Sequence, residues 1–252
     1  MKDAKTLAYI NMFGILGALE KLAELDADAR ALLAGTKPVS LGISVKDGPQ
    51  SVLSFSPDGC RQTEGAGDCD IKLAFSSPEK FNGMIDGTVT PIPRKGFTKI
   101  GFLTGTFVKL TDLLTKYLRS SEEDLKDERF FEISTSLMFY VICGAVAQIG
   151  NHDEIGRFSA SNIADGKVVI SIKGGPKATL DVKGHVLTMT RAGSPSPRAV
   201  MEFASMRLAR DLFDGAVNSL ACIGRQEITV TGLISMLDNI NRILDRVALY
   251  LA

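Results

Sequence analysis

Histidine is scarce in this chain and offers little material for a metal site. It occurs only as His152 and His185, and neither has a second histidine or a cysteine at metal-ligand spacing. The four cysteines contain no Cys-x-x-Cys pair, and the first residues do not follow the plan of a signal peptide. We therefore expect a reduced, cytoplasmic protein that holds no metal and no other cofactor.

An excess of positive charge is also lacking. The 29 basic residues are balanced by 29 acidic residues, so the formal net charge is zero. Proteins that bind nucleic acid by its phosphates carry a basic surplus or a basic stripe. The charge balance argues against a nucleic-acid partner.

A hydrophobic run long enough to span a bilayer is missing as well. The strongest candidate, Leu137 to Ala147, has eleven apolar residues when Gly144 is included, whereas a spanning helix needs about twenty. We expect this run to form a buried helix. No transmembrane segment is predicted, although transient contact with a membrane is compatible with the sequence.

Catalytic signatures are weak. Gly65-Ala66-Gly67 lacks the third glycine and the strand-helix context of a nucleotide site. The His152-Asp153-Glu154 cluster is most simply a solvated loop, although a metal or acid-base role is the alternative. Ser194 and Ser196 lie in a proline-rich loop without the pattern of a nucleophile elbow. We expect no catalytic residues and no enzyme.

The most informative feature that is present is an internal sequence repeat, or echo. Ile43 to Pro49 (ISVKDGP) and Ile170 to Pro176 (ISIKGGP) share five of seven residues at an offset of 127. In each copy β-branched residues alternate with serine and lysine, and the following residues favour a tight turn. Each copy is therefore predicted to form a strand, a turn and a second strand.

An offset of 127 or 128 recurs along the chain, as expected of a repeat the size of a whole domain. The matching segments are Ile15–Leu19 with Ile142–Val146, Phe81–Gly87 with Ala209–Gly215, and Thr104-Gly105 with Thr231-Gly232. Each half has about 125 residues, enough to bury roughly two thirds of its unfolded surface. We predict one domain at 1–120 and a second at 121–252, joined by the charged, serine-containing segment Arg119–Glu128.

Periodicity predicts the order of elements within each copy. The first copy is expected to contain a helix at 6–25, strands at 38–46, 52–55, within 59–64 and at 70–75, a helix capped by Ser77, irregular chain at 88–95, a strand at 98–104 with a bulge at Gly101, and a helix at 106–118. The second is expected to contain a helix at 131–149, a loop at 151–154, strands between 157 and 190, a strand at 199–203, a helix capped by Ser205, a helix at 216–223, a strand at 227–231 and an amphipathic helix at 233–251.

This order, with its shared motifs, resembles the lipid-binding domain of sterol carrier protein 2. The motifs are an apolar strand, a Pro-Glu-x-Phe helix start, an Asp-Gly helix end and a final amphipathic helix. In the first copy they lie at Ile71–Phe75, Pro78–Phe81, Ile85–Gly87 and Ile100–Leu114, and in the second at Val200–Phe203, Leu212–Gly215 and Glu227–Ile243. The Pro-Glu pair is replaced by Met206-Arg207 in the second copy, and the chain ends without a peroxisomal targeting tripeptide.

The resemblance implies an α+β tandem duplication. Each copy would be a five-stranded, mostly antiparallel sheet covered on one face by helices, with an apolar tunnel between sheet and helices. The residues expected to line the tunnel are Phe75, Phe81, Met84, Phe107, Leu110 and Leu114 in the first copy and Phe203, Met206, Phe213, Met236, Leu237 and Ile240 in the second.

The function implied by the resemblance is lipid binding and, by extension, lipid transport. The expected ligand is an apolar molecule such as a fatty acid, a fatty acyl derivative or a sterol-like or isoprenoid-like compound. The alternative from a different class is a structural or interaction module whose cores are filled by side chains. Exposed helix faces could also pair two chains into a homodimer.

Overall fold

The fold is known from a computed structural model, which describes residues 2–251 and all their side chains except that of residue 220. Contacts divide the chain into two compact units, unit 1 (Met1–Ile133) and unit 2 (Ser134–Ala252). The division falls inside one long helix. The domain boundary expected near residue 120 stays a prediction.

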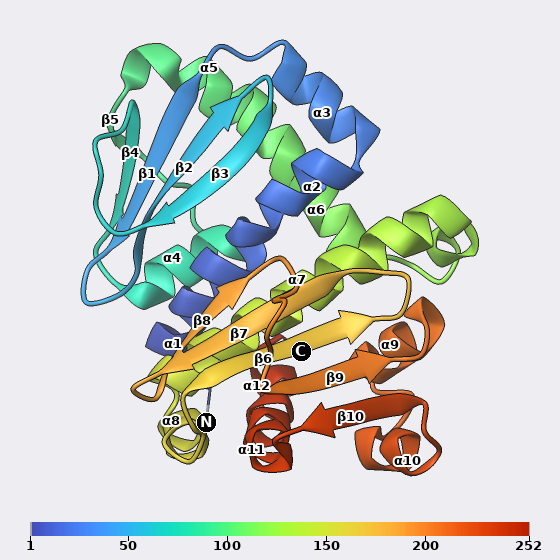
Figure 1. The fold of residues 1–252 in the computed structure, drawn as a ribbon. Helices are drawn as coiled ribbons and strands as arrows, with labels where there is room; N and C mark the ends of the chain where they lie inside the picture. Colours follow the sequence, from blue (N-terminus) through green and yellow to red (C-terminus); the bar gives the residue numbers. More distant parts are fainter. Residues whose placement is uncertain (1, 252) are drawn as a thin grey trace. The chain divides into compact units, whose positions relative to one another are not determined.

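Unit 1 begins with a continuous helical segment, continues through a sheet and ends in a second helical segment (Figure 1). Its elements are α1 (Ala4–Tyr9), η1 (Ile10–Ile15), η2 (Leu16–Ala18), α2 (Leu19–Leu25), α3 (Ala27–Ala34), β1 (Val39–Val45), β2 (Gln50–Ser56), β3 (Gly59–Glu64), β4 (Ile71–Phe75), α4 (Pro78–Ile85), β5 (Pro93–Lys95), η3 (Phe97–Lys99), α5 (Ile100–Phe102), η4 (Leu103–Phe107), α6 (Val108–Leu118) and η5 (Asp124–Lys126).

Unit 2 begins inside the long helix α7 (Glu128–His152). Its further elements are α8 (Glu154–Ala160), β6 (Gly166–Ile172), β7 (Lys177–Lys183), β8 (Val186–Thr190), β9 (Ala199–Phe203), α9 (Met206–Phe213), α10 (Ser219–Gly224), β10 (Ile228–Gly232), α11 (Ile234–Leu244) and α12 (Val247–Leu251).

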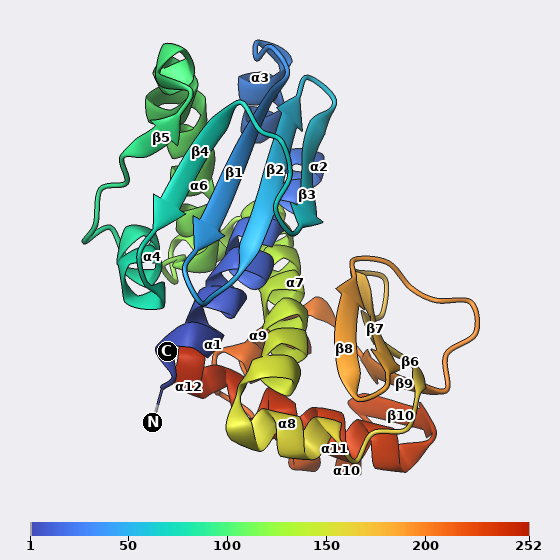
Figure 2. The ribbon, with the colours of Figure 1, turned by 90° about the vertical axis from the view of Figure 1, so that its left-hand side faces the viewer.

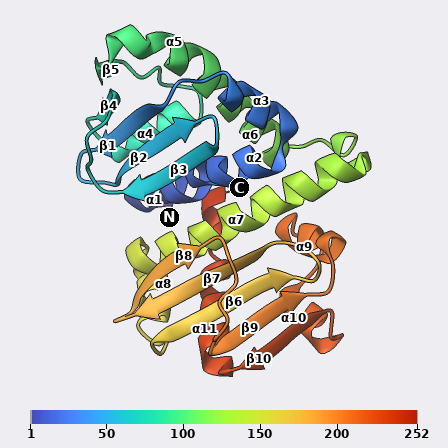
Figure 3. The same cartoon turned by 45° about the horizontal axis from the view of Figure 1, so that its top comes forward.

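The two sheets have the same strand order. Unit 1 is ordered β3-β2-β1-β4-β5, and unit 2, from its hairpin edge, is ordered β8-β7-β6-β9-β10. In each sheet the central pair is parallel, β1 with β4 and β6 with β9, and the other three pairs are antiparallel. The sheets are therefore mixed, which corrects the expectation of a mostly antiparallel sheet. In Figure 3 helices lie behind one face of each sheet, and in Figure 2 the unit 2 sheet is seen nearly edge-on with α7 and α8 to its left.

Local sequence explains the hairpins and the helix starts. Asp47 and Gly174, which differ between the two echo segments, both adopt positive φ (58° and 72°) in the turn. Ser77 and Ser205 both cap their helices by accepting a hydrogen bond from the backbone N–H three residues later. These predicted features are confirmed.

The helix α7 is longer than the apolar run that predicted it. It has 25 residues and is apolar enough, by length and composition, to cross a membrane. However, 72% of its most apolar window is buried inside the structure, as is common for the core helix of a folded domain.

The segment expected as a strand at 98–104 is helical, and this prediction is wrong. The fifth strand of unit 1 is Pro93–Lys95, which was expected to be irregular because of its prolines. Gly96, which follows it, has φ of 90° and abuts β4, where a Cβ would overlap the Asp70 carbonyl oxygen and lie 2.9 Å from the Ile71 Cα. Gly232 follows β10, has φ of 85°, and a Cβ there would lie 2.9 Å from the Ala199 Cα. Gly96 is thus the counterpart of Gly232, which corrects the predicted match of Gly232 with Gly105.

Each unit is tied together by a buried aspartate that caps a helix and accepts a tyrosine hydroxyl. In unit 1 Asp26 accepts from the Ala29 N–H and the Tyr117 hydroxyl, each at 2.7 Å. In unit 2 Asp153 accepts from the Gly156 N–H at 2.8 Å and the Tyr250 hydroxyl at 2.6 Å. The interaction joins the start of a short helix to the end of the last amphipathic segment.

Both short helices, α3 and α8, were missed. Asp153 is buried and forms an N-cap, so the expectation of a solvated loop at His152-Asp153-Glu154 is wrong. Asp153 also forms a double hydrogen bond with Arg246, at 2.7 and 2.8 Å. Burial alone would raise the pKa of Asp153, but the hydrogen bonds from Arg246, Tyr250 and the Gly156 N–H outweigh burial and lower it.

Replacing Asp153 should make the free energy of unfolding less dependent on pH in the acidic range. The pKa of Asp153 lies below its unfolded value, so its contribution is complete above about pH 4 and disappears as the pH falls through the folded pKa. We expect Asp153→Asn to cost about 3 kcal/mol at pH 7, because it leaves Arg246 without its partner. Urea unfolding followed by circular dichroism between pH 7 and pH 3 should show the difference from the wild type shrinking toward low pH. A difference that stays constant would contradict this role.

Replacing Gly96 by alanine should destabilise unit 1 by roughly 2 kcal/mol, because a side chain there is strained at positive φ and overlaps β4. Gly101 provides the matched control. It lies in α5 with no atom within 4 Å of an added Cβ, so Gly101→Ala should stabilise the helix by about 0.5–1 kcal/mol. Thermal unfolding of both variants tests the pair, and equal effects would refute the assigned close contact.

Candidate functional site

The residues predicted to line a tunnel lie on the strand and helices expected for them. Phe75 is on β4, Phe81 and Met84 on α4, Phe107 at the end of η4, and Leu110 and Leu114 on α6. In unit 2 Phe203 is on β9, Met206 and Phe213 on α9, and Met236, Leu237 and Ile240 on α11. Nine of the twelve are buried, whereas Met84, Met206 and Phe213 are partly exposed.

Several of these side chains contact one another within each unit. The rings of Phe75 and Phe81 meet edge to face at 5.3 Å between centroids, and those of Phe203 and Phe213 do so at 6.1 Å. Phe107 packs against Phe55 on β2 at 6.0 Å. The tunnel at these positions stays a prediction.

The last helical segment of each unit carries a stripe of buried residues, and the two stripes have the same spacing. In unit 1 it consists of Leu103, Phe107, Leu110, Leu114 and Tyr117, and in unit 2 of Met236, Ile240, Ile243, Val247 and Tyr250. Successive residues of each stripe are four, three, four and three positions apart, which places them on one face of a helix. Their offset is 133 residues, so the final helices correspond at a different offset from the sheets.

The helices of unit 1 contain two π-helical stretches, η1 and η4, and no π-helix is found among the described residues of unit 2. A π-turn leaves backbone groups to be satisfied by other partners, and such turns are frequent at functional sites. In η1 the carbonyl oxygen of Met12 accepts a hydrogen bond from the Gln62 side chain of β3 at 2.8 Å, and Asn11 donates to Asn82 of α4 at 3.0 Å. Polar contacts therefore hold the widened turn in place.

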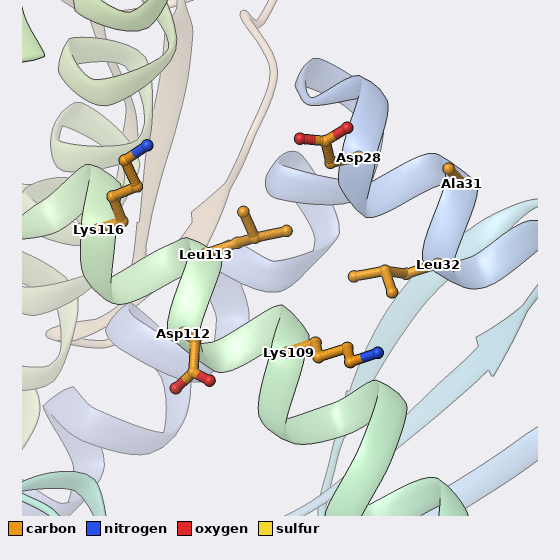
Figure 4. Close-up of a pocket in the computed structure, with 7 residues that line it drawn as sticks. All are labelled: Asp28, Ala31, Leu32, Lys109, Asp112, Leu113 and Lys116. Atoms are coloured by element: carbon orange, nitrogen blue, oxygen red, sulfur yellow. The ribbon is translucent and has the colours of Figure 1, made fainter.

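A groove of about 600 Å³ lies between α3 and α6 of unit 1 (Figure 4). Its apolar residues are Ala31 and Leu32 on α3 and Leu113 on α6. In Figure 4 the side chains of Leu32 and Leu113 point toward each other across the groove. The volume falls within the range of roughly 300–1,000 Å³ that is typical of small-molecule sites.

Charged residues line the groove around its apolar part. Asp28 lies on α3, and Lys109, Asp112 and Lys116 lie on α6. Lys116 is also placed over the ring of Phe130, with 5.4 Å between Nζ and the ring centroid. Two ammonium groups and two carboxylates thus border the apolar strip, which can cover a hydrocarbon chain whose polar end lies beside Lys109 or Lys116.

None of these groove residues was among the predicted site residues. The segment 26–37 showed no sustained hydrophobic pattern, so α3 was not predicted, and a groove between two helices needs both. The available signal was Asp26, an N-cap residue directly before Ala27.

A second, polar hollow of about 350 Å³ lies beside β5 in unit 1. Lys99 donates to Asp70 at 2.6 Å, Lys95 donates to Asp68 at 3.1 Å, and Asp70 also accepts from the Ser40 N–H. The hydrogen bond from Lys99 lowers the pKa of Asp70, and that from Lys95 lowers the pKa of Asp68. These charges are paired with each other beside the start of β4 and the end of β5.

Within residues 2–251 no group of three or more His, Cys, Asp and Glu side chains is arranged to hold a metal ion. The carboxylate of Asp153, which belonged to the candidate acid-base cluster, is bound by Arg246 and Tyr250.

Comparisons with known proteins give matches among solved structures only. No family model matches the chain, and no curated protein matches it. The sterol carrier protein domain 2 of Helicoverpa armigera is similar over 44% of this chain and 88% of its own, with 13% identity and a TM-score of 0.36. The apo form of sterol carrier protein 2 from Yarrowia lipolytica is similar over 42% of this chain and 88% of its own, with 19% identity and a TM-score of 0.33.

Two other solved structures are also similar over part of the chain. A ubiquinone synthesis protein named UbiJ-SCP2 covers 42% of this chain and 93% of its own, with 14% identity and a TM-score of 0.32. The sec-alkylsulfatase Pisa1 from a Pseudomonas species is similar over 57% of this chain but only 28% of its own, with 9% identity and a TM-score of 0.25.

Proposed function

We propose that this protein binds an apolar lipid, such as a fatty acid, a fatty acyl derivative or a sterol-like or isoprenoid-like molecule, and releases it to an acceptor. The observation that carries the proposal is the groove between α3 and α6, in which Leu32 and Leu113 face each other beside Lys109. The sequence motifs that resemble the sterol carrier protein 2 domain give independent support. The proposal includes two copies of one domain, a cytoplasmic location and no catalytic step.

The expected affinity follows from the area that the groove can cover. Each methylene removed from water contributes about 0.8 kcal/mol, so ten buried methylenes contribute about 8 kcal/mol before the costs of association. A dissociation constant of 1 μM corresponds to about 8.2 kcal/mol. An open groove should therefore bind an acyl chain with micromolar or weaker affinity, which suits a carrier that must release its ligand.

The alternative is an interaction module with solid cores. It is favoured by the ring contacts of Phe75 with Phe81 and of Phe203 with Phe213, because these side chains fill space that a tunnel would need. The lipid-binding experiment described next distinguishes the carrier from the interaction module, and the groove from the predicted tunnel.

Filling the groove should abolish lipid binding without unfolding the protein. Native mass spectrometry of the purified protein, followed by titration with a fluorescent fatty acid, should show one acyl chain per molecule. Leu113→Trp is expected to weaken binding at least tenfold, since an indole occupies the space between the two leucines. Val108→Trp is the matched control on the same helix, because Val108 is 43% exposed and does not line the groove.

The remaining outcomes decide among the alternatives. Loss of binding in Leu237→Trp but not in Leu113→Trp would place the lipid in the predicted tunnel of unit 2. An apo mass together with no binding of the fluorescent fatty acid would refute the lipid proposal and favour the interaction module. Lys109→Gln should weaken the binding of a fatty acid more than the binding of the matching fatty alcohol. Only the acid carries a charge that can pair with the ammonium group.

A further inference from the structure

The end of the unit 1 sheet exposes a concentration of apolar side chains. We call residues Ile92–Ile100 the β5 corner, because they contain β5 and the turn that follows it, at the edge of the sheet (Figure 1). Within these nine residues Ile92 is 76% exposed, Phe97 61% and Ile100 44%. Large apolar side chains that gather at one place on a surface commonly mark a binding site, whereas isolated ones do not.

The β5 corner packs against β4 at Gly96. This residue adopts φ of 90°, and any side chain there would overlap β4, so the close contact requires glycine. The exposed ion pairs Lys95–Asp68 and Lys99–Asp70 lie on either side of Gly96 and add little to stability, because solvent screens them. The close contact at Gly96 restricts the chain that carries the exposed side chains, which lowers the entropy lost when a surface binds them.

The charge around the corner is biased although the whole chain is neutral. Residues 87–111 contain four basic residues, Arg94, Lys95, Lys99 and Lys109, and no acidic residue. The two lysines of the corner are paired with aspartates, whereas Arg94 is exposed and forms no ion pair among the described residues. Each paired ammonium group has three N–H donors and spends one on its aspartate, so it retains donors for a second acceptor.

Unit 2 exposes apolar residues at the equivalent place. Leu233 and Ile234 follow Gly232 and are 36% and 55% exposed, as Phe97 follows Gly96. The charged residue in contact with them is Arg198, whose carbonyl oxygen accepts a hydrogen bond from the Leu233 N–H and whose guanidinium group donates to the Asp165 carbonyl oxygen at 2.5 Å. Unit 1 differs because its corner itself contains three basic residues within nine positions.

We infer that the β5 corner docks unit 1 onto an anionic lipid surface. Phe97 and Ile92 enter the boundary between headgroups and acyl chains, while Arg94 and the free N–H groups of the two lysines bind headgroup phosphates. Alternating apolar and basic side chains suit such a surface, because the bilayer supplies apolar depth and anionic charge together. Guanidinium groups also match the geometry of phosphate oxygens. This inference does not depend on a lipid being carried in the groove.

The test is sedimentation of the full chain with vesicles. Binding is compared on pure phosphatidylcholine and on phosphatidylcholine with about 30% phosphatidylserine, at about 0.1 M and 0.5 M salt. We expect binding to the anionic vesicles only, and much weaker binding at high salt. Phe97→Ser should reduce the partition coefficient about tenfold, and Arg94→Gln about fivefold, since one basic residue at an anionic surface contributes about 1 kcal/mol.

The matched control is Phe158→Ser. Phe158 lies on α8 of unit 2 and is 69% exposed, so this variant removes an equally exposed phenyl ring from a helix that carries both Glu154 and Arg157. It should bind the anionic vesicles as the wild type does. Circular dichroism and thermal unfolding must show that all three variants remain folded, as expected for substitutions at exposed positions.

Four results would overturn the inference. These are no binding to the anionic vesicles, equal binding to neutral vesicles, an unchanged partition of Phe97→Ser, and self-association of the chain that is lost in Phe97→Ser. The last result would assign the β5 corner to a second copy of this chain. Fatty-acid binding by Phe97→Ser is measured in parallel. Retained acyl binding with lost vesicle binding in Phe97→Ser separates docking from the carrier function. Vesicle binding by a wild-type chain that binds no fatty acid refutes the carrier function alone.

Discussion

The hydrogen bond between a helix-capping aspartate and a tyrosine hydroxyl determines how each unit closes. Asp26 with Tyr117, and Asp153 with Tyr250, connect the chain just before the sheet to the last helical segment after it. Both partners of each pair are buried, so each satisfies a group that would otherwise cost free energy in the interior. With the two ends of a unit held together, the last helical segment must turn its apolar stripe toward the interior.

The units differ in how they use this shared plan. Unit 2 strengthens its aspartate with Arg246, and its helices contain no π-turn among the described residues. Unit 1 has two π-helical stretches and an open groove whose apolar part includes Leu32 and Leu113. Exposed large apolar side chains occur in both units, so the units differ in their π-helical stretches and in the groove. The groove is the basis for placing the lipid site in unit 1, and the basic residues beside Phe97 are the basis for placing the membrane contact there.

The sequence predicted much of the framework and little of the candidate site. The hairpins followed from alternating β-branched residues, and the starts of α4 and α9 followed from Ser77 and Ser205, because these signals act within a few residues. The fifth strand of unit 1 was missed because Pro93 argued against it. Proline is compatible with an edge strand, and β5 lies at the edge of its sheet. That fact becomes visible only when the strands are paired.

What the sequence by itself determined is the periodic, local part of this protein: the echo at Ile43 and Ile170, the strands it predicts, and the amphipathic final helix. Tertiary structure alone decided that Gly96 corresponds to Gly232, that Asp153 is buried against Arg246, and that Leu32 and Leu113 face each other. The physical reason is distance along the chain. Asp153 and Arg246 are 93 residues apart, and Leu32 and Leu113 are 81 apart, so neither pairing leaves a short-range pattern for sequence reasoning to detect.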